Sequence, residues 1–111
     1  KPLVLNGTAE EILTRANHCI EKMIVEIVLT KPKAIPQDGK IVLFERRTPQ
    51  QSNIANLNAL SDVYDHIRML DAKGYPTAYI STTHHNYSFT NVQRDGDELV
   101  ATVRISMRDI L

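Results

Sequence analysis

The sequence of 111 residues has no tryptophan, a single cysteine and no surplus of charge. Because Cys19 has no partner in the chain, an internal disulfide and a zinc site built on thiolates are both excluded, and we interpret it as a small buried apolar residue. Thirteen basic and thirteen acidic side chains balance, so nothing attracts nucleic acid or an anionic membrane surface. No apolar run approaches the roughly 20 residues of a membrane-spanning helix. The composition indicates one small domain from a reducing compartment, which we expect to be cytoplasmic.

The N-terminal third predicts one long amphipathic helix, from Thr8 to about Leu29. Thr8 and Glu11 have the spacing of a capping box, in which each side chain accepts a hydrogen bond from the other residue's backbone amide. Lys31-Pro32 ends the helix, because a residue before proline is displaced from the α region. The apolar stripe is broad enough to be covered on more than one side. It recurs with helical period at Ile12, Leu13, Ala16, Cys19, Ile20, Met23, Ile24, Ile27 and Val28.

Residues 33–56 are predicted to form a linker that contains one short strand. Asp38-Gly39 indicates a turn, and the apolar run Ile41–Phe44 favours a strand. Thr48-Pro49 then ends regular structure. The polar stretch Gln50–Asn58 predicts an irregular loop or a short helical turn.

Residues 57–111 are predicted to form a helix followed by a β-hairpin. Asn58 or Ser61 supplies the expected N-cap oxygen. Gly74 is expected in the left-handed conformation after the last turn, and Pro76 prevents the helix from resuming. The helix presents one apolar stripe made of Leu60, Val63, Tyr64, Ile67 and Leu70.

The C-terminal strands are predicted from alternation and from one turn. The segment Arg94–Asp97 contains Asp-Gly between alternating stretches, which is a strong hairpin signal. Val92 is out of phase with Tyr87 and Phe89, so we expect a bulge near Asn91. Met107–Leu111 is expected to extend the sheet or to lie across it. The fold class is therefore α+β: a long N-terminal helix, a linker, and a small antiparallel, open-barrel-like sheet with one packed helix.

Candidate chemical groups are few. His84 and His85 are adjacent, so on a regular strand they point to opposite faces and cannot bind one metal ion together. Asp62 with His66 and Arg68 with Asp71 have the spacing of local pairs on a helix face. No set of residues assembles an acid, a base and an electrophile stabiliser. We therefore predict no catalytic residue and no metal site in this chain.

The pair Arg46-Arg47 is the one candidate for substrate binding. Guanidinium groups match the geometry of phosphate and carboxylate. A purely structural role is the alternative, because neither a glycine-rich loop nor a helix N-terminus stands beside the pair in the sequence.

Two motifs carry a family resemblance. HIRMLDAKGYPTAYI (His66 to Ile80), with FERRTPQQSNI (Phe44 to Ile54), resembles the C-terminal part of formyltransferases that use 10-formyltetrahydrofolate. These include methionyl-tRNA formyltransferase and the sugar N-formyltransferases. The resemblance extends upstream to PLVLNGTAEEILTRA (Pro2 to Ala16). In tRNA formyltransferases the later motif looks more like I-R-A-x-x-P-W-P, whereas RMLDAKGYP (Arg68 to Pro76) is more similar to the sugar formyltransferases and their uncharacterised relatives.

The resemblance implies an organisation and a role. Residues 1–32 correspond to the last helix of the catalytic domain, 33–56 to a linker with a short strand, and 57–111 to a C-terminal module of helix and hairpin. The family's catalytic Asn, His and Asp and its H-P-S-x-L-P loop lie in an N-terminal domain that is missing here, and the start at Lys1 fits a fragment. The chain alone is therefore expected to be inactive and to bind no cofactor. 10-Formyltetrahydrofolate belongs to the parent enzyme.

The sequence is compatible with more than one function. The leading hypothesis is that the chain is a structural or substrate-placing part of an enzyme. That enzyme would formylate the amine of a nucleotide-linked amino sugar. Another is a free-standing interaction or dimerisation module of the same ancestry, and a further one is the C-terminal part of a methionyl-tRNA formyltransferase-like protein. A nucleic-acid-binding barrel is disfavoured, because Tyr87 and Phe89 lack a basic field. Expected partners are the missing catalytic domain and a second copy, through the first helix or the sheet edge.

Overall fold

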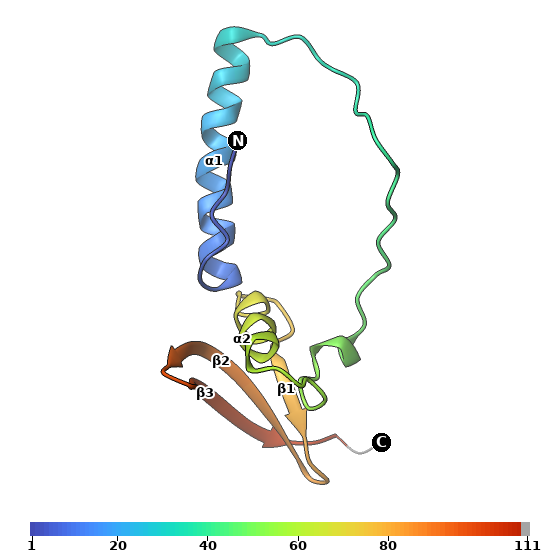
Figure 1. Cartoon of the computed structure of the whole chain (residues 1–111), viewed down its shortest axis with the longest axis vertical. Helices are drawn as coiled ribbons and strands as arrows, with labels where there is room; N and C mark the ends of the chain where they lie inside the picture. Colours follow the sequence, from blue (N-terminus) through green and yellow to red (C-terminus); the bar gives the residue numbers. More distant parts are fainter. Residues whose placement is uncertain (110–111) are drawn as a thin grey trace.

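The computed structural model describes residues 1–109 and confirms the α+β class. Figure 1 shows a long helix standing on a small layer of helix and sheet, with an open arch of chain between them. The molecule is elongated, with extents of 57 × 32 × 25 Å. None of the described helices is long and apolar enough to cross a membrane. The elements in chain order are α1 (Ala9–Thr30), the 3-10 helix η1 (Pro49–Ser52), α2 (Leu60–Met69), β1 (Ala78–Ser81), β2 (His85–Asp95) and β3 (Glu98–Met107).

Both predicted ends of α1 are confirmed. Glu11 N donates to Thr8 Oγ1, and Thr8 N donates to Glu11 Oε1, each at 3.3 Å, which completes the capping box. The helix ends at Thr30, and Lys31 turns into the left-handed region with φ of 46°. Because Pro32 excludes the right-handed helical conformation for the residue before it, the chain leaves the helix at this point.

The predicted start of α2 is wrong. Ala59 occupies the N-cap position without a side-chain hydrogen bond, so neither Asn58 nor Ser61 caps the helix. The carbonyl oxygen of Ala59 accepts from the amides of Asp62 and Val63 at 3.1 and 3.2 Å. The first turn is therefore closed by the backbone alone.

The end of α2 also differs from the prediction, because the helix stops at Met69 rather than at Gly74. The backbone carbonyl of Asp71 accepts from Glu10 N at 3.0 Å, which draws the chain toward the start of α1. Gly74 has a φ of 85° and lies in a separate turn, closed by Tyr75 N and the carbonyl oxygen of Ala72 at 3.0 Å. Gly74 thus serves the turn into β1 and is not the helix cap.

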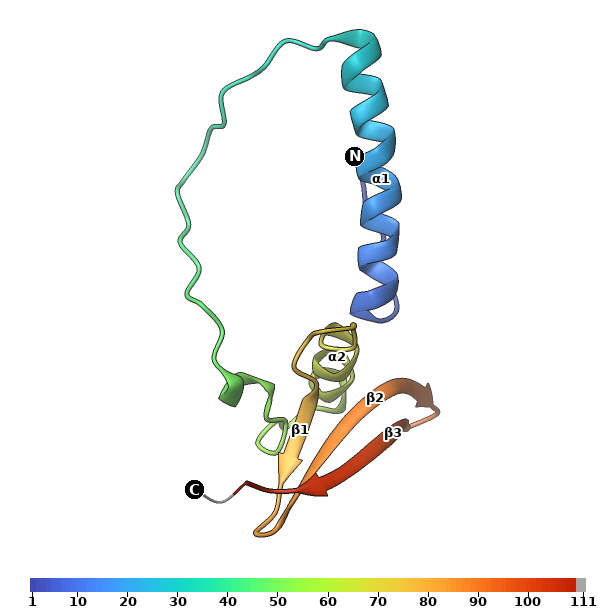
Figure 2. The same cartoon turned by 180° about the vertical axis from the view of Figure 1, so that it is seen from behind.

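The sheet is antiparallel with strand order β1-β2-β3. Figure 2 shows β2 between its two neighbours. The predicted hairpin is confirmed, with Asp95 opposite Glu98 at its end. The predicted bulge is also confirmed, because the register shifts between Thr90 and Gln93 and Asn91 has a φ of 53°. β3 ends at Met107, and residues 110–111 of the tail expected at Met107–Leu111 lie outside the described residues.

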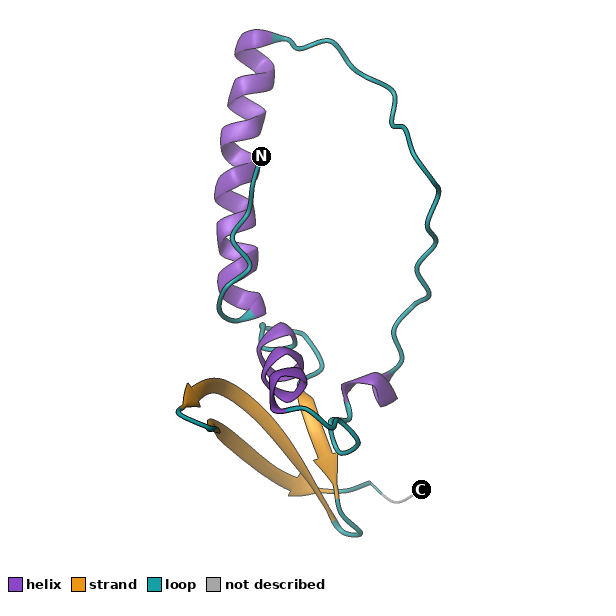
Figure 3. Cartoon of the chain, viewed as in Figure 1, coloured by secondary structure: helices purple, strands orange, loops and turns teal. Residues whose placement is uncertain are grey.

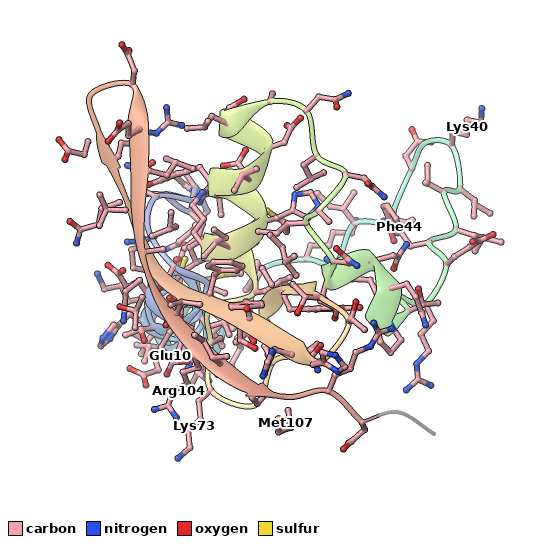
Figure 4. All side chains as sticks on the ribbon, turned by 90° about the horizontal axis from the view of Figure 1, so that it is seen from below. Glu10, Lys40, Phe44, Lys73, Arg104 and Met107 are labelled. Carbon is pink, nitrogen blue, oxygen red and sulfur yellow. The ribbon has the colours of Figure 1, made fainter. Side chains whose placement is uncertain are left out.

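The predicted strand at Ile41–Phe44 is wrong. These residues belong to the arch of residues 31–48, where all side chains are exposed, including Phe44 at 92%. Figures 3 and 4 show this segment as loop, with Lys40 and Phe44 to one side of the sheet. A strand needs a neighbour for its backbone hydrogen bonds, and the edge of β1 is already met by Ile54 N, which donates to the carbonyl oxygen of Tyr79 at 3.0 Å.

The core lies between α2 and one face of the sheet. Half-buried side chains of both layers surround it, whereas α1 contributes only Ala9 to the buried residues. Much of the predicted apolar stripe of α1 faces outward, and Cys19 on it is half-buried. The core cluster consists of Ile54, Ile67, Leu70, Ala78 and Val92.

Candidate functional site

Two surface hollows meet at Arg47. The first, of about 310 Å³, is lined mostly by polar residues, and the second, of about 390 Å³, has a mainly apolar lining. Of the predicted pair, Arg47 alone lines both hollows, while Arg46 is exposed and lines neither. The first hollow is lined by Arg47, Gln51, Asn53, Leu57 and His66, and the second by Arg47, Thr48, Pro49, Ser52, Met69, Leu70, Tyr75 and Pro76.

Helix η1 holds the Arg47 guanidinium in place. Pro49 occupies the first turn of η1, where its fixed φ and missing amide are compatible with a helix start. Thr48 N donates to Gln51 Oε1 at 2.9 Å, and Arg47 Nη2 donates to the carbonyl oxygen of Gln51 at 3.1 Å. The side chain is thereby folded back over η1, and its remaining N–H groups can serve a ligand.

His66 gives the first hollow a second polar group of defined orientation. Its Nδ1 lies 2.9 Å from the carbonyl oxygen of Asp62. A carbonyl only accepts, so Nδ1 carries the proton in this contact and Nε2 accepts in the neutral ring. The expected pairing of Asp62 with His66 therefore occurs through the backbone and not through the carboxylate.

The second hollow offers apolar surface rather than charge. Met69 and Tyr75 are 51% and 45% exposed there, and Pro76 continues the same wall. Because Tyr75 presents a flat ring with a polar tip, the hollow suits a planar group of a ligand. Together the two hollows can receive a molecule with one anionic and one planar part.

Arg68 fixes the other side of the module to the segment just before α1. Its Nε lies 2.9 Å from Asp65 Oδ1, so its ion pair is with Asp65 rather than with the predicted Asp71. Its Nη1 donates to the carbonyl oxygens of Leu5 and Gly7 at 2.8 and 3.2 Å. These two bonds span more than sixty residues, so only the Asp65 spacing was readable from the sequence.

Glu10 completes this connection from the side of α1. Its backbone amide donates to the carbonyl oxygen of Asp71, and its Oε2 accepts from Lys73 N, both at 3.0 Å. The N-terminal end of α1 is thus hydrogen-bonded to the end of α2, and Figures 1 and 2 both show the two helix ends meeting. We call this the α1–α2 junction, made by Glu10, Arg68, Asp71 and Lys73.

Other charged and histidine groups lie away from the hollows. His84 lies in the turn before β2, and its ring stands edge-on to that of His85, with centroids 6.3 Å apart. Lys1 Nζ and Glu26 Oε2 form an ion pair of 2.5 Å. This hydrogen bond lowers the pKa of the Glu26 carboxyl and raises the pKa of the Lys1 ammonium.

The arrangement defines a class of small α+β module, in which one helix covers a three-stranded antiparallel sheet and a junction fixes a long amphipathic helix to it. Residues 49–106, just over half of the chain, match the family model described as the C-terminal domain of methionyl-tRNA formyltransferase. The chain belongs to this family. The predicted resemblance to formyltransferases is thereby confirmed.

A solved structure extends the similarity to nearly the whole chain. The methionyl-tRNA formyltransferase from Clostridium thermocellum superposes with a TM-score of 0.89 at 38% sequence identity. The match covers 96% of this chain and 47% of that structure, so the chain spans about half the length of its relative. No curated protein matches the chain.

Proposed function

We propose that the chain is the C-terminal module of a cytoplasmic enzyme that transfers a formyl group from 10-formyltetrahydrofolate to an amine. Its role is to place the acceptor and to support a catalytic domain, while the chemistry and the folate belong to that domain. The α1–α2 junction carries this proposal. Lys73 N donates to the Glu10 carboxylate, and Arg68 donates to the carbonyl oxygen of Leu5 just before α1. Because these bonds fix the module to the start of α1, anything bound along α1 is held in a defined position relative to the Arg47 hollows.

The exposed surface of α1 supports a catalytic domain as its partner. Apolar side chains occupy the outward face over most of the helix, with Ile24 55% and Val28 66% exposed. A contiguous apolar surface of this kind favours an interaction site. A domain packed on it would bury the stripe and would stand beside the module that positions its substrate.

We propose a nucleotide-linked amino sugar as the acceptor. Its phosphates would bind the Arg47 guanidinium in the hollow that His66 also lines, and its base would pack in the apolar hollow beside Tyr75. The charge of the module supports a small acceptor over tRNA. Residues 49–106 carry four basic side chains (Arg68, Lys73, Arg94 and Arg104) and six acidic ones (Asp62, Asp65, Asp71, Asp95, Asp97 and Glu98), so this region has a net charge of −2. Proteins that bind nucleic acid through phosphates need a basic surface.

Methionyl-tRNA is the second candidate acceptor, favoured by the names of the matching family and of the similar solved structure, which are both methionyl-tRNA formyltransferases. Its binding would fall steeply with salt, because each phosphate contact releases counterions. Nucleotide binding at a single Arg47 site would depend on salt far more weakly. A salt titration therefore separates the two acceptors.

The binding experiment uses the 111-residue chain and two probes, pyrophosphate and a uridine diphosphate sugar, followed by NMR. We expect shifts at Arg47 and His66 and, for the sugar nucleotide alone, at Tyr75. R47A should weaken binding of both probes at least fivefold, while the neighbouring R46A should leave it unchanged. Equal losses in R46A and R47A, or no binding of either probe, would contradict a substrate site at Arg47.

Formyl transfer is tested separately from binding. The isolated chain with 10-formyltetrahydrofolate and an amino sugar nucleotide should show no turnover, whereas turnover would overturn the supporting role. The free-standing interaction module differs in its gene: a coding sequence that continues upstream into an H-P-S-x-L-P loop excludes it.

A further inference from the structure

The outer edge of β3 is open along its length. Strand order β1-β2-β3 places β3 at the margin of the sheet, and among the described residues it pairs with β2 only. The opposite margin is different, because Asn53 and Ile54 meet β1 at Tyr79. An open edge of ten residues, Glu98–Met107, is a template for another strand.

The apolar face of β3 is covered over only half of its length. Alternate residues share a face, and Leu99 and Ala101 on this face pack against the core beneath α2. The same face continues through Val103, Ile105 and Met107, which are 44%, 61% and 72% exposed. Figure 4 shows Met107 beside the margin of the sheet. One half of the strand therefore lacks a cover that the other half has.

A hollow lies beside the covered half. It measures about 360 Å³ and is lined by Leu60 and Val63 of α2, by Asp97 of the hairpin turn, and by Glu98 and Leu99 at the start of β3. Leu60 is 52% exposed at its rim. The molecule thus presents an apolar hollow at one end of β3 and exposed apolar side chains at the other.

We propose that two copies of this chain pair antiparallel along β3, about a two-fold axis at Ala101, to form one six-stranded sheet. Successive residues on either side of the axis then oppose each other. Leu99 faces Val103 of the second copy, and Asp97 faces its Ile105. The exposed Val103 and Ile105 of each copy enter the hollow under Leu60 of the other, and this exchange occurs twice because the interface is isologous.

The charges on the other face of β3 are complementary in the same register. Glu98 opposes Arg104 of the second copy, and these two residues form no salt bridge within the described chain. Within one copy, Glu98 lies directly opposite Asp95, a like-charge pair that destabilises an isolated hairpin. The guanidinium of the second copy would stand beside both carboxylates. Registers centred on Thr102 or Val103 oppose Arg104 to Val100 or to Thr102 and lose this pairing.

Charge reversal tests the register. In sedimentation equilibrium of the full chain, E98R places arginines opposite each other and R104E places glutamates opposite each other, so each single variant should weaken the dimer at least tenfold. The double variant E98R/R104E restores opposite charges and should return the dimer to within about threefold of the parent. A monomeric parent, or a double variant no tighter than the singles, would overturn the proposal.

A disulfide tests the axis independently. In a C19S background, A101C should cross-link to its own copy, because opposed residues lie about 4.5–5.5 Å apart between Cα atoms, within disulfide range. I105C is the matched control, since its two copies would stand eight residues apart along the strands, about 26 Å. If the copies instead associated through α1, A101C and I105C would cross-link equally poorly. The charge-reversal variants would then dimerise as tightly as the parent. Neither substitution lies in the Arg47 hollows, so pyrophosphate binding should persist in all variants. The dimer and the proposed function are thereby tested independently.

Discussion

The carboxylate of Asp71 accepts a hydrogen bond of 2.9 Å from the backbone amide of Asn91. Asn91 sits at the β-bulge, where the register of β2 shifts and the ladder offers its amide no regular partner. The same Asp71 receives Glu10 N on its backbone carbonyl. One residue after α2 thus holds both the bulge and the start of α1.

Replacing Asp71 with alanine should destabilise the chain by about 1–2 kcal/mol, since a charge-assisted hydrogen bond and the partner of a bulge amide are lost together. The change is measured as a shift in the urea midpoint. D62A is the control, because this exposed carboxylate in the first turn of α2 contributes mainly to the helix dipole, at most about 0.5 kcal/mol. Equal losses in both variants would mean that the Asp71–Asn91 contact contributes nothing of its own.

Asn91 itself should tolerate only residues that accept its left-handed backbone. N91G should be neutral or slightly stabilising, whereas N91V should cost about 1–2 kcal/mol, because a β-branched side chain is strained at a φ of 53°. The comparison is made by denaturant unfolding. Equal stabilities of N91V and N91G would mean that the bulge had rearranged. The hydrogen bond between Asn91 and Asp71 would then not depend on the left-handed backbone.

Removing the Arg68 side chain should loosen the α1–α2 junction. R68A deletes the ion pair with Asp65 and both bonds to the backbone near Gly7, and we expect a loss of about 1–2 kcal/mol in a partly exposed site. Hydrogen exchange should rise over residues 8–12 more than in the sheet. R46A, an equally sized change on the exposed arch, should leave the exchange pattern unaltered. A uniform rise in exchange would indicate global destabilisation instead.

Thr8 should account for much of the stability of the first turn of α1. T8A removes the capping box and should cost about 1 kcal/mol. T14A is matched in chemistry, but it removes only a bond from Thr14 Oγ1 to the carbonyl oxygen of Glu10 inside the helix and improves helix propensity. Circular dichroism during thermal unfolding should therefore show a lower midpoint for T8A alone.

Local signals in the sequence predicted the features that depend on neighbouring residues. The capping box of Thr8 and Glu11, the stop at Lys31-Pro32, the hairpin around Gly96 and the bulge at Asn91 each need only a few consecutive side chains. The end of α2 was not predictable in this way. It is set by Glu10, which lies about sixty residues away in the chain and binds the carbonyl of Asp71.

The candidate site was partly predictable for the same reason. The guanidinium pair was visible in the sequence, but the choice of Arg47 over Arg46 depends on η1 folding back beneath it. His66 was noted for its spacing from Asp62, and only the fold brings it to the wall of the Arg47 hollow. The strand predicted at Ile41–Phe44 is wrong for a related reason. β-Propensity describes single residues, whereas a strand also needs a neighbouring strand, which the sequence of this segment does not reveal.

The arch, fully extended, would reach farther than the length of α1. Helix α1 rises about 33 Å over its 22 residues, whereas the eighteen residues 31–48, fully extended, reach about 60 Å. Since the α1–α2 junction joins the two parts at the other end of α1, the arch does not set their relative position. The α1–α2 junction therefore holds the two parts together without help from the arch. Cutting or shortening the arch should leave the junction intact. Such a segment is a natural place for insertions to accumulate without disturbing either part.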